Sequence, residues 1–204
     1  MIVHADAAYL IAEKPAGLPT VPGRPVELHD CLWHRVRDLH PDALVVHRLD
    51  MGTSGLVVFA RGIEAQRALS RAFEQRLIGK TYVALADGDP AADNGEIDLP
   101  LAADWLARPR QVVDHKNGRS ALTRWRVLER HGTHSRIELQ PRTGRSHQLR
   151  VHMASIGHPL LGDPLYAPPA IEATMPRLAL HASGLAFMHP FEHTPRTYSS
   201  VVPF

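Results

Sequence analysis

A lone aspartate, Asp50, stands in a short polar segment between two apolar segments of the chain. Residues 47–55 read HRLDMGTSG, and residues 43–46 before them and 55–60 after them are apolar. Both apolar segments are typical of short strands, and the glycines and hydroxyl residues between them are typical of a tight turn. A carboxylate at the end of a buried strand is costly to desolvate unless it has a partner or a task. Asp50 is therefore the first candidate for a catalytic group.

The segment 47–55 resembles the catalytic motif of the RluA family of pseudouridine synthases. Four further segments resemble other motifs of that family: EKPAGL at 13–18, GKTYVA at 79–84, RTGRSHQLRVH at 142–152, and GHPLLGD at 157–163 followed by Tyr166. A single match of this kind arises readily by chance, but five matches in the family's order do not. The resemblance covers most of the chain.

The resemblance implies an enzyme that isomerises uridine in RNA to pseudouridine and needs no cofactor. The reaction breaks the bond between ribose C1′ and uracil N1, turns the base and rejoins it through C5. By resemblance, Asp50 is the nucleophile or nucleophile-like group. Attack at C1′, assistance to a glycal and addition at C6 of the ring all stay open from the sequence. Each route needs a charged, positioned and water-shielded carboxylate.

The resemblance also gives Arg150 and Tyr82 roles beside Asp50. Arg150 is expected to form an ion pair with Asp50, which would lower the pKa of that carboxyl against the upward effect of burial and orient its oxygens. Tyr82 is expected to stack on the extracted uracil and to act as a general acid or base through its hydroxyl. The alternative for Tyr82 is a core residue, the usual role of an aromatic residue on a strand.

Several further residues are expected to contact RNA. Arg48, two residues before Asp50, is expected to fill the gap left when the uridine flips out, a step that costs about a few kcal/mol; the alternative is a salt bridge to a neighbouring carboxylate. Leu149 and Val151 are expected to wall the uracil pocket, although core packing would favour the same residues. Other expected contacts lie before a helix, in an arginine-rich insertion and at the cleft rim: Arg145, His147, Arg108, Arg110 and Lys14. For Lys14 the alternative is a plain solvated lysine.

Composition fits a globular RNA-binding protein without identifying one. The chain has 204 residues, a net charge of +2, 44% hydrophobic and 22% charged residues, which is ordinary for a globular protein of one large or two small domains. Twenty of the 23 basic residues are arginines. Arginine binds phosphate through paired hydrogen bonds and stacks on bases, although codon preference alone would produce the same bias. No apolar run approaches the ~20 residues that span a bilayer.

Apolar periodicity and capping residues predict three helices, over residues 30–39, 63–77 and 146–156. Asp30 and Ser146 are the expected N-caps of the first and third helices. Gly157 is expected to end the third helix. Leu77 is expected to face the core at the end of the second.

Strands outnumber helices in the prediction. The expected strands are residues 9–13, 43–46, 55–60, 80–86, 120–128, 135–139, 178–186 and 198–202, with a polar turn at 89–95 and an inserted loop or hairpin at 99–117. Helices and strands are interspersed without strict alternation, which favours an α+β fold over a doubly wound sheet. The resemblance implies the pseudouridine synthase fold, an extended mixed sheet with flanking helices and a central cleft.

The resemblance implies one catalytic domain over residues 1–204. Lys14 and its motif lie so near the start that no S4-type RNA-binding domain, which many relatives carry, is expected. No signal or transit peptide is expected either. The single cysteine, Cys31, suits a reducing cytoplasm. We therefore expect a cytoplasmic monomer without a membrane segment.

The fourteen histidines raise the question of a metal site. His29, Cys31 and His34 form one candidate group, and His147 with His152 forms another. Neither spacing matches the HExxH pattern or the paired-cysteine patterns of zinc sites. We expect no metal.

The segment 98–110, outside the catalytic motifs, resembles the branch of the family that modifies both large-subunit rRNA and the anticodon stem-loop of tRNA. A different tRNA or rRNA uridine is the alternative substrate. A non-catalytic RNA-binding relative and a glycosidic-bond hydrolase are the alternative functions. The hydrolase would need a second carboxylate, which Asp163 could supply.

Overall fold

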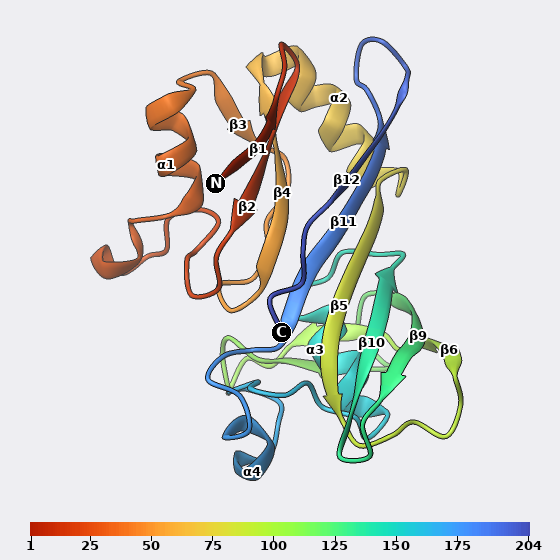
Figure 1. The fold of residues 1–204 in the computed structure, drawn as a ribbon. Coiled ribbons are helices and arrows are strands. Elements are labelled where there is room, and N and C mark those ends of the chain that lie inside the picture. Colours follow the sequence, from red (N-terminus) through yellow and green to blue (C-terminus); the bar gives the residue numbers. More distant parts are fainter. The chain divides into compact units, whose positions relative to one another are not determined.

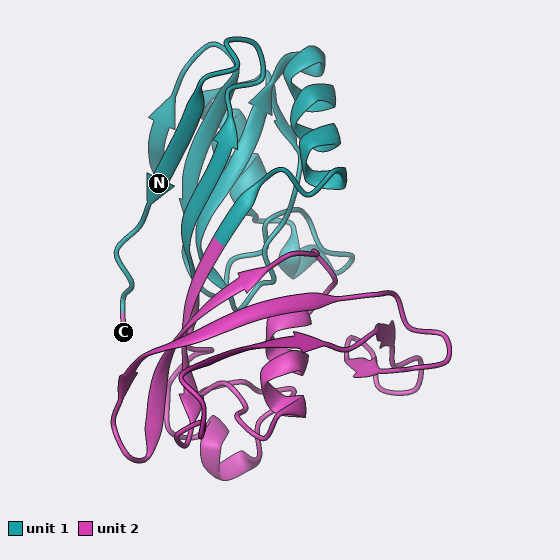
Figure 2. Cartoon of the chain, turned by 90° about the vertical axis from the view of Figure 1, so that its right-hand side faces the viewer, with its two compact units in different colours: residues 1–80, 182–203 teal, residues 81–181, 204 magenta.

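The computed structural model describes residues 1–204 and has an α+β fold. Ten of its twelve strands belong to one sheet and two form a separate hairpin, so the predicted fold class is confirmed. The chain divides into two compact units (Figure 2): unit 1 is Met1–Lys80 with Ala182–Pro203, and unit 2 is Thr81–His181 with Phe204. No helix is long and apolar enough to cross a membrane.

In unit 1 the strand order is β1-β2-β4-β11, with β3 added beside β4 and β12 beside β11. Strand β2 pairs antiparallel with both β1 and β4, and β3 and β12 are antiparallel to their neighbours (Figure 1). The strands are β1 (Ile2–Ala5), β2 (Tyr9–Lys14), β3 (Ala43–Val45), β4 (Ser54–Arg61), β11 (Leu180–Met188) and β12 (Pro195–Ser199), and the helices are α1 (Leu32–Leu39), α2 (Gly62–Glu74) and the 3₁₀ turn Val26–Leu28.

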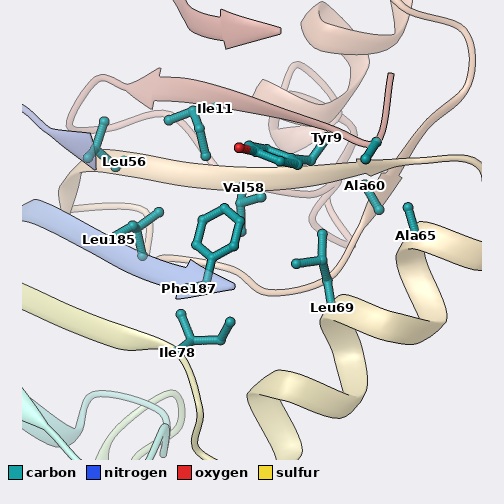
Figure 3. Packing of buried hydrophobic residues seen from close by; sticks show 11 residues of the cluster. Tyr9, Ile11, Leu56, Val58, Ala60, Ala65, Leu69, Ile78, Leu185 and Phe187 are labelled. Atoms are coloured by element: carbon teal, nitrogen blue, oxygen red, sulfur yellow. The ribbon is translucent and has the colours of Figure 1, made fainter. Parts of the chain in front are cut away.

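The core of unit 1 lies between these strands and α2. Alternate residues of β2 and β4 point to one side, where Ala65 and Leu69 of α2 and Phe187 of β11 meet them (Figure 3). Gly55 is required at the start of β4 because its φ is +114° and a Cβ there would lie 2.3 Å from the carbonyl oxygen of Ala182. This close approach accounts for the glycine that ends the segment 47–55.

In unit 2 the strand order is β5-β10-β9-β6, and all three pairs are antiparallel. The strands are β5 (Gly79–Asp87), β6 (Asn94–Asp98), β9 (Leu122–Arg130) and β10 (His134–Pro141); β5 and β11 each contribute residues to both units. Helix α3 (Gln148–Ser155) is buried from Gln148 through Met153, and α4 (Pro169–Glu172) is one short turn. The predicted insertion is a hairpin of β7 (Leu101–Ala103) and β8 (Gln111–Val113).

All eight predicted strands are present within a few residues of their expected bounds. The sequence analysis missed two strands, β1 and β6. Strand β6 was missed because its first residues, Asn94 and Gly95, belong to a polar segment that predicted a turn. Its strand conformation comes from antiparallel pairing with β9, a long-range contact that local propensity does not contain.

The prediction that Asp30 caps the first helix was wrong. Helix α1 begins at Leu32 after Cys31, without a side-chain cap. The Asp30 carboxylate instead accepts two hydrogen bonds from the Arg35 guanidinium, at 2.8 and 2.5 Å. The prediction that Leu77 faces the core was also wrong, because α2 ends at Glu74 and Leu77 is 65% exposed.

The prediction that Ser146 caps the third helix was wrong as well. Helix α3 begins after His147, whose φ is +53°. The buried side-chain oxygen of Gln148 accepts the Arg145 N–H at 3.0 Å and the Thr143 hydroxyl at 2.6 Å. A buried amide therefore closes the turn before the helix in place of a serine cap. The predicted stop at Gly157 is confirmed by its φ of +86° and by its N–H, which bonds the Ala154 carbonyl at 3.1 Å.

Candidate active site

Asp50 lies on the loop that joins β3 to β4 in unit 1. Its carbonyl accepts the Thr53 N–H at 3.1 Å, which closes a turn directly after it. The Asp50 side chain is half-buried, whereas the neighbouring Arg48 is exposed. The loop thus presents an arginine to solvent next to a partly sheltered carboxylate.

Thr20 holds the loop on the amino-terminal side of Asp50. Its hydroxyl donates to the Leu49 carbonyl at 2.8 Å and accepts the Leu49 N–H at 3.1 Å. Both Thr20 and Leu49 are buried. One side chain therefore satisfies both polar backbone groups of the residue before Asp50, as buried groups require.

Lys14 holds the loop on the other side. Its side chain is 0% exposed, and its ammonium donates to the carbonyls of Pro15, Leu18 and Met51 at 3.0, 2.7 and 3.0 Å. The Met51 carbonyl also accepts the Gly17 N–H at 2.9 Å. The three ammonium hydrogens are thus directed at three carbonyls of the protein.

The prediction that Lys14 contacts RNA was therefore wrong. A fully buried ammonium that donates to three carbonyls is not available to a phosphate on the surface. In the structure it joins the carbonyls of Pro15 and Leu18 to that of Met51, directly after Asp50. The sequence contained one usable signal: only Glu13 separates this lysine from the apolar residues 9–12, and a lysine is almost never fully buried unless it is paired.

His47 anchors the start of the same loop. Its Nε2 accepts the Val58 N–H of β4 at 3.0 Å, and its ring stacks on Phe73 of α2 at a centroid distance of 4.6 Å. Burial, with a contribution from the Lys80 ammonium, lowers the pKa of His47 to about 3. Burial also lowers the pKa of Lys80 to about 8. His47 is therefore a neutral structural anchor at neutral pH.

In unit 2 the Arg150 guanidinium forms a buried ion pair with Asp163. Nε of Arg150 donates to one carboxylate oxygen at 2.8 Å and an Nη donates to the other at 2.5 Å. The same carboxylate accepts the N–H groups of Leu165 and Tyr166, at 2.9 and 3.2 Å. Asp163 is the structural partner of Arg150, a role that the sequence analysis did not assign to it.

Tyr166 connects this ion pair to the hairpin. The Arg150 guanidinium lies 5.0 Å from the centre of its ring and the Arg110 guanidinium 5.2 Å. Its hydroxyl accepts the Gln111 N–H at 2.8 Å and lies 2.7 Å from Nδ1 of His147. Burial raises the pKa of Tyr166, so the hydroxyl keeps its proton and can donate it to His147. Two predicted RNA contacts, Arg110 and His147, therefore meet at one tyrosine.

Asp163 and Tyr166 had a signal in the sequence. Both belong to the motif that begins at Gly157, and a buried aspartate requires a cationic or hydrogen-bonding partner. The sequence analysis weighed Asp163 only as the second acid of a hydrolase. Its two-point pairing with Arg150 makes it a structural carboxylate within unit 2.

The remaining predicted residues lie in unit 2. Arg145 is half-buried, and its Nε donates to the Ser120 carbonyl at 3.1 Å. Leu149 and Val151 are both buried in separate apolar clusters, which the core alternative for them also predicts. Tyr82, opposite Leu139 in the β5–β10 register, is half-buried.

Asp50 belongs to unit 1, whereas Arg150 and Tyr82 belong to unit 2. The ion pair between Asp50 and Arg150 therefore stays a prediction. The structure has no group of three or more histidine, cysteine or carboxylate side chains that could hold a metal ion.

Comparisons with known proteins point to one chemistry. A family model described as RNA pseudouridylate synthase matches residues 8–155. The chain is 49% identical over 196 residues, 96% of this chain and 80% of the relative, to the "Dual-specificity RNA pseudouridine synthase RluA" of Vibrio cholerae serotype O1. It is 43% identical over 205 residues, 100% of this chain and 94% of the relative, to the protein of the same name from Escherichia coli strain K12.

Solved structures with a similar fold carry names of the same kind. The solved structure of "Human RNA Pseudouridylate Synthase Domain Containing 1" superposes with a TM-score of 0.83 at 28% identity, over 100% of this chain and 83% of that chain. "Human RNA Pseudouridylate Synthase Domain Containing 4" superposes with a TM-score of 0.78 at 26% identity, over 99% and 88% of the two chains.

Proposed function

The chain belongs to the RNA pseudouridine synthase family, and from that premise we propose that Asp50 is the carboxylate with which it isomerises a uridine of RNA. The observation that supports Asp50 is the double tether of its loop. Buried Thr20 bonds the residue before it, and buried Lys14 bonds the residue after it. A catalytic group needs such support, because small displacements from the productive geometry are costly in rate.

The isomerisation conserves atoms and electrons. The C1′–N1 bond breaks, the C1′–C5 bond forms, and the hydrogen on C5 leaves as a proton while N1 gains one. Asp50 acts at C1′, either directly or through a glycal, or at C6 of the ring. Arg150 pairs with Asp50 and orients it, and the Tyr82 hydroxyl moves a proton. We propose no metal or cofactor for these steps.

RNA contact completes the proposal. The exposed Arg48 side chain, two residues before Asp50, fills the space that the flipped uridine leaves in the RNA. Leu149 and Val151 wall the uracil pocket. Arg145, His147, Arg108 and Arg110 contact the backbone phosphates. For the last two residues the supporting observation is their place in the turn between β7 and β8.

We propose that the substrates are the anticodon stem-loop of tRNA and large-subunit rRNA, or one of the two. The support is the resemblance of the 98–110 segment and the printed name of the relatives, which calls them dual-specificity enzymes. The alternative is a single different tRNA or rRNA uridine.

The proposal includes one catalytic domain, acting as a monomer in the cytoplasm. The single cysteine, Cys31, is buried and free, which fits a reducing compartment.

Tritium release from RNA that carries label at C5 of uridine tests the proposed function. Isomerisation releases the label, binding alone does not, and hydrolysis of the glycosidic bond yields free uracil. The variant Asp50→Asn keeps the shape of the side chain and should lose turnover while it retains RNA binding. The exposed Asp38→Asn on α1 is the matched control. Turnover by Asp50→Asn above the no-enzyme level would exclude Asp50 as the essential group.

The same assay separates the two roles of Tyr82. Tyr82→Phe keeps the ring and loses the hydroxyl, so RNA binding should persist while the rate falls by about 10²–10⁴, the usual contribution of general acid–base catalysis. Normal turnover by Tyr82→Phe would leave only the stacking role.

The substrate proposal has its own test. A short stem-loop with the target uridine in its loop should be a substrate without a whole tRNA or ribosome, because loop bases are already splayed for flipping. Its affinity should fall steeply with salt, since phosphate contacts release counterions. Activity confined to intact ribosomal particles would contradict the dual-substrate proposal.

A further inference from the structure

The turn between β7 and β8 exposes two large apolar side chains next to each other. Trp105 is 73% exposed and Leu106 is fully exposed. They stand beside Arg108 and Arg110 in the same turn. Two adjacent exposed apolar side chains beside two arginines are a candidate interaction site.

The turn that carries Trp105 is well fixed. One carboxylate oxygen of Asp104 accepts the N–H groups of Leu106 and Ala107, both at 3.1 Å. The Asp104 N–H bonds the Arg110 carbonyl at 3.0 Å, and the Arg110 N–H bonds the Ala107 carbonyl at 2.9 Å. These bonds close the turn on itself. The backbone that carries Trp105 therefore needs no further ordering when a partner binds.

One face of Trp105 is occupied. The Arg108 guanidinium lies over the ring, with its central carbon 3.7 Å from the ring centre. This is a close cation–π contact. Because Trp105 is 73% exposed, the guanidinium cannot cover both faces of the indole. The Arg108 guanidinium covers one face, and the other face is open to a ligand.

The chemistry of this open face selects its partner. Unpaired RNA bases stack on aromatic rings and on arginine planes, and an aromatic ring next to arginines combines base stacking with attraction to the phosphates. Asp104 is the one acidic group of the turn, and one of its carboxylate oxygens accepts two backbone N–H groups. The two arginines outweigh this single carboxylate, so the turn carries a net positive charge, which fits an RNA strand.

The hairpin is also joined to the catalytic elements of unit 2. The Gln111 N–H of β8 bonds the Tyr166 hydroxyl at 2.8 Å, and the Tyr166 ring lies against the Arg150 guanidinium at 5.0 Å. A base stacked on Trp105 would thus be held on an element with a direct, partly buried connection to Arg150.

We propose that Trp105, backed by Arg108, is a stacking site for an unpaired RNA base other than the uridine that reacts. The inference rests on the proposed function and deepens it, because it assigns a substrate-recognition residue outside the catalytic motifs. The site supplies binding energy to the RNA and leaves the chemical step to the catalytic groups.

Steady-state and single-turnover tritium release from a labelled stem-loop tests the proposal with Trp105→Ala, Trp105→Phe and the matched control Leu106→Ala. Trp105→Ala should raise KM by about 5–150-fold, the effect of losing one base–aromatic stack, and leave the rate at saturating RNA unchanged. Trp105→Phe should retain part of the affinity. Leu106→Ala, one residue away and even more exposed, should have a much smaller effect.

Tryptophan fluorescence adds a direct readout. Stacking should quench Trp105, so RNA should quench the wild-type protein more than Trp105→Phe, which keeps Trp33 and Trp125. An abasic site placed in turn at each loop position should, at one position, weaken wild-type binding and leave Trp105→Ala unaffected. That pattern would identify the stacked base.

The outcomes separate this inference from the proposed function. Equal KM values for wild type and Trp105→Ala would overturn the stacking site. Loss of thermal stability shared by Trp105→Ala and Trp105→Phe, with no difference between them in RNA affinity, would overturn it in favour of a structural tryptophan. Absence of tritium release from wild type would contradict the proposed function, whereas quenching and the abasic scan would still report on stacking.

Discussion

The two units hold their site residues by different means. In unit 1, Lys14 and Thr20 bond the backbone on both sides of Asp50. In unit 2, Arg150 is held at its guanidinium by the carboxylate of Asp163. Unit 1 thus fixes a stretch of chain, whereas unit 2 fixes the charged end of a side chain.

This difference predicts that mutations in the two units have different consequences. A buried ion pair that loses one partner leaves an uncompensated charge in the interior, which is costly for stability. A backbone tether that is lost leaves neutral carbonyls, which relax or find water at a smaller cost. Mutations in the unit 2 network should therefore act first on folding, and mutations of the unit 1 tethers should act first on the rate.

The largest effect should come from Arg150→Ala, which leaves Asp163 buried without its partner. Because both side chains are nearly inaccessible, the free energy of unfolding should fall by ~3–5 kcal/mol. Urea denaturation measures the change. The matched control is Arg124→Ala, which breaks the exposed pair of Arg124 and Glu96 and should cost ~0–1 kcal/mol. Equal costs for the two variants would remove the contrast between buried and exposed pairs.

Lys14→Met should have the next largest effect. The variant keeps most of the length of the side chain and removes an ammonium that bonds three carbonyls, at a cost of up to ~3 kcal/mol. In protein that remains folded, kcat should fall more than RNA affinity, because the Asp50 loop loses its position. Lys116→Met, at an exposed lysine, is the control. A variant with normal kcat would show that this tether does not position Asp50.

Each unit also holds a histidine whose pKa is lowered, and this makes stability depend on pH. Burial lowers the pKa of His47 to about 3 and lowers the pKa of His152 from its ordinary value. In the unfolded chain, His47 binds a proton below its ordinary pKa of about 6.5, whereas in the native protein it stays neutral until the pH approaches 3. The free energy of unfolding therefore falls as the pH decreases from about 6.5 toward 3. Each such group contributes at most ~1.4 kcal/mol per pH unit.

His47→Gln should remove part of this slope, since a glutamine side chain does not titrate there and its oxygen can still accept the Val58 N–H. Urea denaturation at pH 7, 6, 5 and 4 measures the slope. The exposed His131→Gln serves as the comparison. An unchanged slope in His47→Gln would mean that His47 binds its proton equally well in the folded and unfolded chains.

The smallest effect should come from Thr20→Val, which keeps the shape of the side chain and removes one hydroxyl. The Leu49 N–H and carbonyl lose their shared partner, and the stability should fall by ~1 kcal/mol. A fall in kcat larger than this stability loss would identify Thr20 as a positioning residue. A stability loss matched by no change in kcat would restrict its role to folding.

Much of the fold was predictable from the sequence, because apolar alternation and periodicity are local features of the chain. Strands such as β2 and β4, and the longest helix, α2, were predictable from the spacing of their apolar residues. The failures were at ends and edges. Asp30 and Ser146 looked like helix caps, but Arg35 and Gln148 offered bonds that the sequence spacing does not reveal. Strand β6 formed because β9 pairs with it.

By itself the sequence determined which residues are candidates for chemistry: the Asp50 segment, Tyr82, Arg150 and the arginines around them are recognisable as types in a fixed order. Only the tertiary structure decided what several of them bond. The ammonium of Lys14 donates to three carbonyls of the protein and is therefore not an RNA contact. Asp163 joined Arg150 across thirteen residues of chain. The physical reason is that burial and hydrogen-bond partnership depend on distances in space, and a residue's type specifies only which bonds it is able to form.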